Sequence, residues 1–578
     1  MDNRPDVKLH STSHYFLEGL NEIGVEYLFC NFGTDHAPLI EEMARWQREG
    51  RALPKTLLCP HENTAIHMAA GFAAVTGRGQ AVLVHVDAGT GNCVLGAHNV
   101  RRARTPLLLM AGKAPYTVRG ELPGGRDNYV HFIQEPYDQA SLVRPYVKWE
   151  WTLPSGVVTK EVLRRAHSLA HSDPKGPVYL MLPRETLAEE WDEKAVRPFP
   201  ADRYGPSRAG AGDTESVNQL ADRLLAARRP ILFTAYAGRS MEAPALIAEL
   251  AAFAGIGVVD SHPIYLGLAH DDPHYLGSTP AEALPECDVG LLLDVDVPWI
   301  PKFARENPAT WWGHVDVDVI KQDFPMWGFA SDLRIQGDSV LVLRQLIAAL
   351  RSRASPAQRD AAAARSRALA GESRARRARL EAAAADPGAP GRLNPAHVCA
   401  RIAAALGPDD IVVNEAVRNS PVVLNHVPRN RPGTFIGFAG GGLGGAAGLA
   451  LGAKLARPAS AVVQFIGDGG FYFNNPSSTY AVARQYGLPI LTVVFDNGGW
   501  SAVKEATLRM YASGDAFDTQ QFQARLAPEV QFADVVRSAG GHGETVSDPA
   551  ALPAAVQRCF AAVRGGRAAL LHVKVPQI

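Results

Sequence analysis

Residues 461–500 read AVVQFIGDGGFYFNNPSSTYAVARQYGLPILTVVFDNGGW, and this stretch is the most informative part of the sequence. Its pattern predicts a strand, a tight glycine turn that carries an acid, a helix, a second strand and a polar glycine-rich turn. The first turn is Gly467-Asp468-Gly469, and the second, Asp496-Asn497-Gly498-Gly499, follows after 26 further residues. Because the carboxyl ends of parallel strands meet at one edge of a sheet, Asp468 and Asn497 are expected to converge on one cation. Their oxygen atoms suit Mg²⁺ or Ca²⁺, and the glycines leave room for a phosphate.

The same alternation of short apolar runs and Ala-rich helical stretches continues along almost the whole chain, which is typical of α/β layers with parallel sheets. Two stretches interrupt it: residues 191–213 are rich in Pro, Gly and charge, and residues 352–394 hold an Arg/Ala-rich helix followed by prolines and glycines. The pattern therefore predicts an α/β fold of three doubly wound parallel-sheet domains over 1–190, 205–355 and 395–578. A helical and Pro/Gly linker over 356–394 joins the last two. The similar size and rhythm of the domains indicate internal duplication.

Composition excludes several classes of protein. The 578 residues are 47% hydrophobic and 20% charged, and 58 basic residues against 59 acidic ones give a net charge of -1. This balance argues against a chain that coats nucleic acid or an anionic membrane. No apolar run approaches the roughly 18 residues of a membrane-spanning helix, and the polar segment 1–10 lacks the apolar core of a secretory signal. Six widely spaced cysteines without a CxxC pair favour a reducing cytoplasm, so we expect a cytoplasmic enzyme.

The spacing of GDG and DN resembles the cofactor motif of the thiamine diphosphate (ThDP, or thiamine pyrophosphate) enzymes, the family of acetolactate synthase, pyruvate oxidase and benzoylformate decarboxylase. The resemblance covers nearly the whole chain and implies a pyrimidine-binding domain at 1–190, a central domain, and a diphosphate-binding domain at 395–578. It also implies that Asp468, Asn497 and the carbonyl of Gly499 hold Mg²⁺, with Gly467, Gly469, Gly470 and Trp500 around the cofactor. The family usually has asparagine where this chain has Asp496, so the local charge and the preferred metal stay open.

The stretch CPHENTAIHMAAGFAAVTGRG, residues 59–79, predicts a helix with Glu62 in its first turn. An acid there complements the helix dipole, which is the structural interpretation. The resemblance implies another role, in which Glu62 hydrogen-bonds the aminopyrimidine ring of ThDP and activates the cofactor. In GFAGGGLGGAAGLALGAKLA, residues 437–456, Leu443 resembles the large apolar residue that keeps the cofactor bent, with Gly441 beside it. The preceding residues Glu415, Ala416 and Val417 would lie at the diphosphate or the substrate, and Arg418 would contact either an anionic group or a surface carboxylate.

Residues near the reacting carbon are predicted from four positions. Asp35, in FCNFGTDHAPL, stands where the keto-acid decarboxylases of the family have an aspartate, and it could relay protons together with His36; its alternative role is a loop cap. A carboxyl held away from water there is expected to have a raised pKa. Gln134, in an FIQE segment, is a candidate for lining the pocket, and Glu505 follows the second metal turn. The segment HVDAGTGN, residues 85–92, lacks the double histidine of pyruvate decarboxylases.

The resemblance implies a ThDP-dependent decarboxylase or carboligase that acts on 2-keto acids or related carbonyl compounds through a thiazolium ylid and an enamine. The alternatives are a lyase on 2-hydroxyketones or 2-hydroxyacyl-CoA, an acetolactate synthase-like enzyme with FAD, and a non-catalytic scaffold subunit. The segment AYAGRS, residues 235–240, departs from the glycine-rich run that FAD would meet. The expected partners are a small carbonyl substrate and the chain itself, as a homodimer at least and a homotetramer beyond that, with neither nucleic acid nor membrane.

Overall fold

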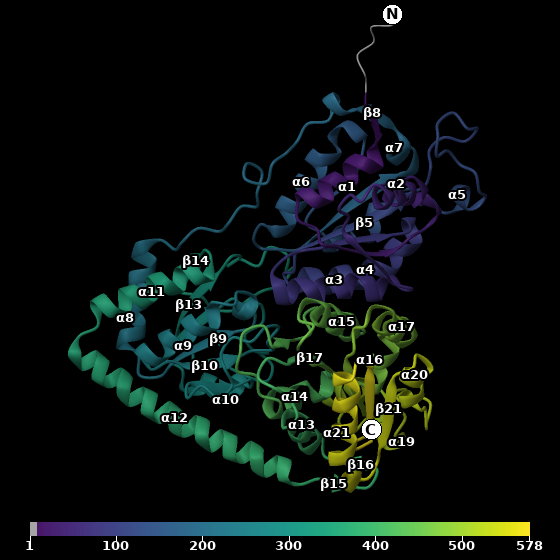
Figure 1. Ribbon diagram of the computed structural model, residues 1–578. Coiled ribbons are helices and arrows are strands. Elements are labelled where there is room, and N and C mark those ends of the chain that lie inside the picture. Colours follow the sequence, from purple (N-terminus) through teal and green to yellow (C-terminus); the bar gives the residue numbers. More distant parts are fainter. Residues whose placement is uncertain (1–7, 578) are drawn as a thin grey trace, which may run out of the picture. The chain divides into compact units, whose positions relative to one another are not determined.

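The computed structural model describes residues 8–577, so the first seven residues of the polar amino-terminal segment lie outside the described residues (Figure 1). The chain divides into two compact units, which are described one at a time. The first comprises residues 1–207, 439–456 and 477–486, and the second comprises residues 208–438, 457–476 and 487–578. The first unit therefore includes two segments from the C-terminal part of the sequence.

The first unit is built on a six-stranded sheet in which every neighbouring pair of strands is parallel. The strands lie in the order β3-β2-β4-β5-β7-β6. Figure 1 shows α3 and α4 on one face of this sheet and α1 and α6 on the other. The strands are β2 (Tyr27–Asn31), β3 (Lys55–Leu58), β4 (Ala81–Val84), β5 (Leu107–Lys113), β6 (Glu150–Thr152) and β7 (Pro177–Pro183), and a separate pair joins β1 (Leu9–Ser11) to β8 (Glu190–Asp192). The helices are α1 (Thr12–Glu22), α2 (Ala37–Arg48), α3 (Glu62–Thr76), α4 (Val86–Arg102), α5 (Val130–Ile133), α6 (Thr159–His171) and α7 (Arg184–Ala188), with α15 (Ala446–Ala456) and nearly all of α17 (Pro476–Tyr486) added from the C-terminal part.

The C-terminal sheet of the second unit repeats the topology of the first sheet. Its strands lie in the order β18-β17-β19-β20-β22-β21, again all parallel. Numbered within each sheet, both orders read second, first, third, fourth, sixth, fifth. The strands are β17 (Ile411–Glu415), β18 (Phe435–Ile436), β19 (Val462–Gly467), β20 (Leu491–Asp496), β21 (His542–Val546) and β22 (Ala569–Lys574). The helices are α13 (Pro395–Ala403), α14 (Ser420–His426), α16 (Asp468–Phe473), α18 (Ser501–Met510), α19 (Asp515–Thr519), α20 (Phe532–Ser538) and α21 (Leu552–Arg564).

The central sheet of the second unit has a different order, β11-β10-β9-β12-β13-β14, which reads third, second, first, fourth, fifth, sixth. This is the doubly wound order of dinucleotide-binding sheets. The strands are β9 (Pro230–Thr234), β10 (Gly257–Asp260), β11 (Tyr275–Gly277), β12 (Val289–Leu293), β13 (Trp311–Asp316) and β14 (Leu333–Gln336), and the helices are α8 (Thr214–Ala226), α9 (Ala243–Ala254), α10 (Pro280–Ala283) and α11 (Ser339–Arg353). The expected fold class, three parallel-sheet α/β layers, is confirmed, and the matching strand orders relate the first and last sheets but not the central one.

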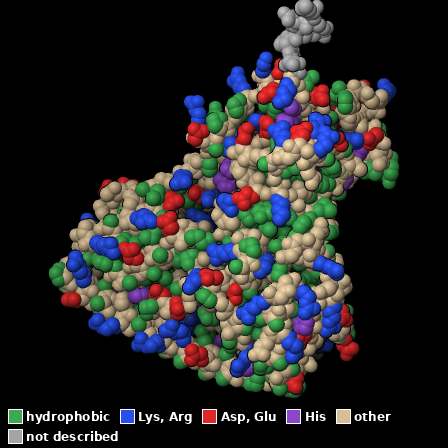
Figure 2. Space-filling view, viewed as in Figure 1, with side chains coloured by type: hydrophobic (Ala, Val, Ile, Leu, Met, Phe, Trp, Pro, Cys, Tyr) green, Lys and Arg blue, Asp and Glu red, His purple; other side chains and the backbone are tan. Residues whose placement is uncertain are grey.

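An Arg-rich helix, α12 (Pro356–Ala385), follows α11 and leads to the short hairpin β15 (Gly388–Ala389) and β16 (Arg392–Leu393). Only Ala362, Leu369 and Ser373 of α12 are buried, which is one narrow stripe of a helix. Figure 2 shows many Lys and Arg side chains, in blue, along this part of the molecule. Within residues 8–577, no helix is both long enough and apolar enough to cross a bilayer.

In the first unit α3 packs on α15, and this contact depends on glycine. A Cβ built on Gly452 would stand 2.0 Å from the carbonyl oxygen of Met68, and a Cβ on Gly71 would stand 2.2 Å from that of Leu449. Backbone therefore meets backbone at both points, and any larger residue would push the helices apart. The small residues of 437–456 thus serve helix packing, and they fix the position of the turn that carries Leu443.

We predict that Gly452→Ala destabilises the protein, because the new Cβ would overlap a backbone atom. A backbone atom cannot move aside by a change of rotamer, as a side chain can. Overpacking of this kind costs on the order of 1–3 kcal/mol. The matched control is Gly91→Ala on α4, where a Cβ meets no atom within 4 Å. There the gain in helix propensity should leave stability unchanged or raise it by up to about 1 kcal/mol. Equal denaturant midpoints for the two variants would show that the helices separate without cost.

Candidate functional site

Glu62 begins α3, and its carboxylate is buried and held by two amides. Asn31 Nδ2, at the end of β2, donates to Glu62 Oε1 at 2.9 Å, and Asn92 Nδ2, on α4, donates to Glu62 Oε2 at 2.9 Å. The helix starts there because Nδ1 of His61, the N-cap residue, accepts the N–H of Asn63 at 3.1 Å. With 6% of its surface exposed, Glu62 is fixed in direction by neighbours from two other elements. Two amide donors from different elements therefore orient a buried carboxylate at the start of α3.

The turn that carries Leu443 is attached to the start of the same helix. Asn63 Nδ2 donates to the carbonyl of Gly444 at 2.9 Å, and Asn99 Nδ2, on α4, donates to the carbonyl of Gly442 at 2.8 Å. Leu443 itself is half-buried between these two anchored residues. Gly441 has a φ of +78°, and a Cβ there would meet no atom within 4 Å, so the backbone faces open space. The first unit therefore brings Glu62 and the Leu443 turn together.

Asp35 lies in a short 3₁₀ turn, η1 (Thr34–His36), and pairs with a histidine that sequence reasoning missed. His85, the first residue after β4, places Nδ1 2.5 Å from Asp35 Oδ1 and Nε2 3.1 Å from Gln134 Oε1. Both ring nitrogens thus face oxygen acceptors, which favours the doubly protonated imidazolium. Asp35 and His36 are buried, whereas His85 and Gln134 are half-buried. The structure therefore joins Asp35 and Gln134 through His85.

The charges of this cluster contradict the expected rise in the pKa of Asp35. Burial alone would raise the pKa of Asp35, but the hydrogen bond from His85 and the neighbouring His36 outweigh it, so the pKa lies below its ordinary value rather than above it. The hydrogen bond to Asp35 raises the pKa of His85. Burial lowers the pKa of His36, whose Nδ1 accepts the N–H of Gly33 at 3.0 Å. The proton of this cluster is consequently held on His85, and Asp35 is its counter-ion.

In the second unit, the two predicted metal turns meet. Asp468 begins α16 directly after β19, and it is 3% exposed. Its carboxylate accepts the N–H of Gly469 at 2.8 Å and lies against the carboxyl of Asp496, which accepts the N–H of Gly498 at 3.0 Å. Burial raises the pKa of Asp468 to about 7, and the nearby Asp496 adds to the shift. A buried acid in this state is one to which a divalent cation would bring charge compensation.

The unusual Asp496 is neutralised by the neighbouring strand. On β22, His572 Nε2 lies 2.7 Å from Asp496 Oδ2, and Lys574 Nζ lies 2.5 Å from the same oxygen. Burial opposes ionisation, but these two hydrogen bonds outweigh it and lower the pKa of Asp496 below its ordinary value. The extra carboxylate is therefore an internal ion-pair partner, and the local charge that the sequence left open is balanced by Lys574.

The other residues predicted to bind the diphosphate lie near the Gly467-Asp468-Gly469 turn. Glu415, at the end of β17, is buried, and Val417 has a φ of +45°, a strained value for a β-branched residue. A Cβ on Gly469 would meet the ring of Trp500 at 2.5 Å, so that ring packs directly on the first turn, whereas a Cβ on Gly467 meets no atom within 4 Å. Arg418 forms an ion pair with Glu505. Of the two roles that the sequence left open for Arg418, the structure shows the carboxylate contact.

An ion pair lies at the carboxyl edge of the central sheet, at the place where a dinucleotide would bind. In this strand order a dinucleotide would bind where β9 and β12 diverge. Arg239, after β9, places Nη1 2.7 Å from Asp294 Oδ2, after β12, and the N–H of Tyr236 donates to the carbonyl of Asp294 at 2.9 Å. A cofactor diphosphate would meet a buried carboxylate there instead of free N–H groups.

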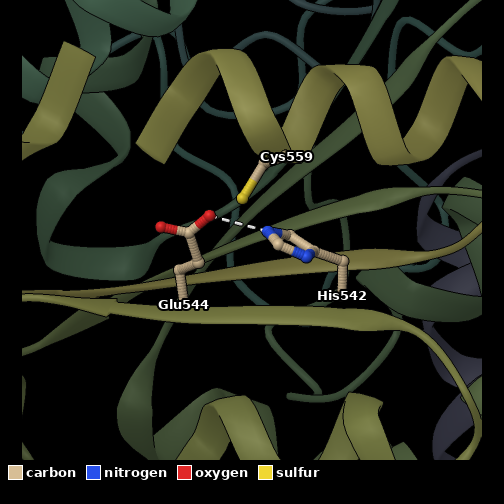
Figure 3. Close-up of side chains that lie close together, drawn as sticks. All are labelled: His542, Glu544 and Cys559. Atoms are coloured by element: carbon tan, nitrogen blue, oxygen red, sulfur yellow. Dashed lines mark hydrogen bonds and ion pairs between the residues drawn. The ribbon is translucent and has the colours of Figure 1, made fainter. Parts of the chain in front are cut away.

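A further cluster lies away from these residues. His542, Glu544 and Cys559 bring one ligand atom each within 4.8 Å of one another, from β21 and α21 (Figure 3). Arg558 donates from Nε to Glu544 Oε1 at 2.8 Å and from Nη2 to Glu544 Oε2 at 2.6 Å. His542 Nε2 lies 2.6 Å from Glu544 Oε1. Burial raises the pKa of the Cys559 thiol to about 12. The cluster is therefore an ion-paired network with a protonated thiol rather than a free ligand set.

The predicted site residues thus form two groups. Glu62, Asp35, His36, Gln134, Gly441 and Leu443 lie in the first unit, and Glu415, Ala416, Val417, Gly467, Asp468, Gly469, Gly470, Asn497, Gly499, Trp500 and Glu505 lie in the second. Asn31, Asn92, His85 and Lys574 join them as residues that the sequence did not single out. The signal available for His85 and Asn31 was their position at the carboxyl ends of neighbouring strands, β4 and β2.

Two family models match the chain. Residues 10–142 match the N-terminal TPP binding domain of thiamine pyrophosphate enzymes, and residues 418–573 match the C-terminal TPP binding domain. The first range holds Glu62, Asp35 and His85, and the second holds Asp468 and Asn497.

Relatives match over most of their length. The chain is 24% identical to an acetolactate synthase large subunit of Lactococcus lactis subsp. lactis, covering 86% of this chain and 82% of the relative. It is 26% identical to a benzoylformate decarboxylase of Pseudomonas aeruginosa, covering 86% of this chain and 87% of that relative. Among solved structures, a 4-hydroxybenzoylformate decarboxylase of Rhodococcus jostii RHA1 superposes with a TM-score of 0.76 at 20% identity, covering 98% of this chain and 100% of the other. At that identity the likeness concerns the fold.

We predict that Asp35→Asn lowers the pKa of His85 toward its ordinary value of 6.5, because the hydrogen bond that His85 donates to Asp35 is the largest contribution that raises it. Titration of the His85 ring by NMR, with labelled histidine, measures the shift. Asp87→Asn is the control, since Asp87 makes the smallest of the named contributions. If the two variants titrate alike, Asp35 does not set the charge of His85.

Proposed function

Because the chain belongs to the thiamine pyrophosphate enzyme family, we propose that it is a ThDP- and Mg²⁺-dependent decarboxylase or carboligase of 2-keto acids. The observation that carries the proposal is the buried Glu62 carboxylate, oriented by Asn31 and Asn92 at the start of α3. A scaffold subunit would have no use for an acid buried in this way. The relatives named benzoylformate decarboxylase and acetolactate synthase support the reaction class.

The residues present fit the cofactor. Glu62 would hold the aminopyrimidine ring, and Leu443 would support it from a turn that is fixed to the same helix. Asp468, Asn497 and the carbonyl of Gly499 would hold Mg²⁺ with the diphosphate, since they offer only oxygen ligands. The backbone at Gly467 faces open space, which leaves room for a phosphate.

When bound, ThDP supplies a carbon nucleophile and an electron sink for cleavage next to a carbonyl group. The chain itself supplies the proton. His85 carries that proton with Asp35 as counter-ion, and Gln134 fixes the direction of its second N–H. A half-buried imidazolium in this position is a general acid for the protonation that releases an aldehyde. Asp35 is then a positioning residue that keeps His85 charged, and His36 supports its turn.

Assembly and compartment belong to the same proposal. Glu62 and Asp468 lie in different units, and the family resemblance implies a site shared between subunits, so we propose a homodimer at least, with a homotetramer beyond it. The first unit leaves Tyr129 and Ile133 75% and 74% exposed, which suits an interface. All six cysteines are unpaired and buried, which supports a reducing cytoplasm. The balanced charge supports a partner set without nucleic acid or membrane.

The proposal is tested with a panel of 2-keto acids, with and without an acceptor aldehyde, followed by product analysis. Glu62→Gln should reduce turnover by about 100-fold or more while ThDP still binds, because the amide cannot exchange a proton with the ring. Glu41→Gln, an exposed acid on α2, is the control and should behave as wild type. Unchanged turnover in Glu62→Gln would reject the assignment.

Asp468→Asn should weaken ThDP binding in the presence of Mg²⁺ by about tenfold or more, because the metal loses its charged ligand. Isothermal titration of ThDP with and without Mg²⁺ measures the effect. Asp534→Asn, an exposed acid on α20, serves as the control. Equal affinities for Asp468→Asn and wild type would place the metal elsewhere.

A further inference from the structure

Two cavities of the second unit share one side chain, Lys504 on α18. The larger has a volume of about 450 Å³ and is lined by Arg418, Asn497, Lys504, Glu505, Leu508 and Gln577, among others. The smaller, of about 290 Å³, is lined by Lys504, Arg525 and the residues between 520 and 524. Asn497 is one of the candidate metal ligands, so the larger cavity borders the second metal turn, and four residues of α18 line it: Ser501, Lys504, Glu505 and Leu508.

The charges along the two cavities do not cancel. Among the described residues that line them, Glu505 carries the only carboxylate, against the cations of Arg418, Lys504 and Arg525. The charge of Glu505 is balanced by its ion pair with Arg418. Lys504 forms no ion pair within the described part of the chain. The larger cavity therefore presents one uncompensated ammonium group.

Packing holds Lys504 in place without neutralising it. Its Nζ lies 5.0 Å from the centroid of the Phe522 ring, in a cation–π contact. The contact leaves the three N–H donors of the ammonium for an oxygen acceptor. A half-buried lysine held over a ring, with no carboxylate partner, is arranged to receive an anion rather than to support the fold.

We propose that this cavity selects a substrate with a second anionic group, a carboxylate, at the end distant from its 2-keto acid, and that Lys504 is the specificity-determining residue that pairs with it. The inference rests on the proposed function and adds the substrate class. An apolar substrate would leave the ammonium without an anionic partner, whereas an anion of the right reach would form a charge-assisted hydrogen bond with it.

The test compares 2-keto acids that differ only at the distant end: 2-oxoglutarate against 5-methyl-2-oxohexanoate, and 4-carboxybenzoylformate against 4-methylbenzoylformate. With ThDP and Mg²⁺, the anionic member of a pair should have a kcat/KM higher by about tenfold or more. Lys504→Met should abolish this preference and Lys504→Arg should retain it. Arg509→Met is the matched control, because Arg509 is an exposed cation on the same helix that lines neither cavity.

The remaining outcomes either overturn the inference or require a binding measurement in place of the turnover assay. If Lys504→Met weakens ThDP binding and lowers turnover of both members of a pair equally, the lysine serves the cofactor diphosphate and the inference is wrong. A preference for the neutral member in wild type also rejects it. If wild type converts no 2-keto acid, the proposed function fails, and calorimetry with 2-oxoglutarate on the ThDP-free protein decides instead. Binding lost in Lys504→Met and kept in Arg509→Met supports the anion site, and equal or absent binding in both rejects it.

Discussion

The contact between α3 and α15 is the constraint on which the first half of the site depends. Two glycines, Gly71 and Gly452, let the helix backbones touch, and this closeness lets Asn63 reach the carbonyl of Gly444. Glu62 begins the same helix, so its position and that of the Leu443 turn are set by one packing surface. A looser helix pair would leave both residues in place in the sequence but would separate them in space.

The three sheets use their carboxyl edges differently, although each edge collects polar side chains. In the first sheet, strand ends supply Asn31 and His85, which orient a carboxylate and carry a proton. In the C-terminal sheet, strand ends supply Asp468 and Asp496 beside open glycine backbone. In the central sheet, the pair of Arg239 and Asp294 closes the edge. Strand order alone therefore does not determine whether an edge binds a ligand.

Much of the fold was available in the sequence, because strands buried on both faces of a parallel sheet produce continuous apolar runs that alternate with helices. The meeting of Asp468 with the second turn followed from the same geometry. His85 was missed because its role depends on Asp35, 50 residues away, and a position at the end of a strand does not by itself indicate which side chain the histidine will contact. The expected rise in the pKa of Asp35 was wrong for the same reason, since burial was considered without the partner that outweighs it.

The pairing of Asp496 with Lys574 has a consequence for the history of this site. The two residues face each other across adjacent parallel strands, β20 and β22. An asparagine at 496 would leave the ammonium of Lys574 without its counter-ion, and a neutral residue at 574 would leave the Asp496 carboxylate, beside the metal turn, with His572 but without a lysine. Neither change is tolerated easily by itself, so these positions are expected to covary among homologues, with Asp and Lys gained or lost together. Asp496 is then one half of a coupled exchange between two strands rather than a defect in the motif.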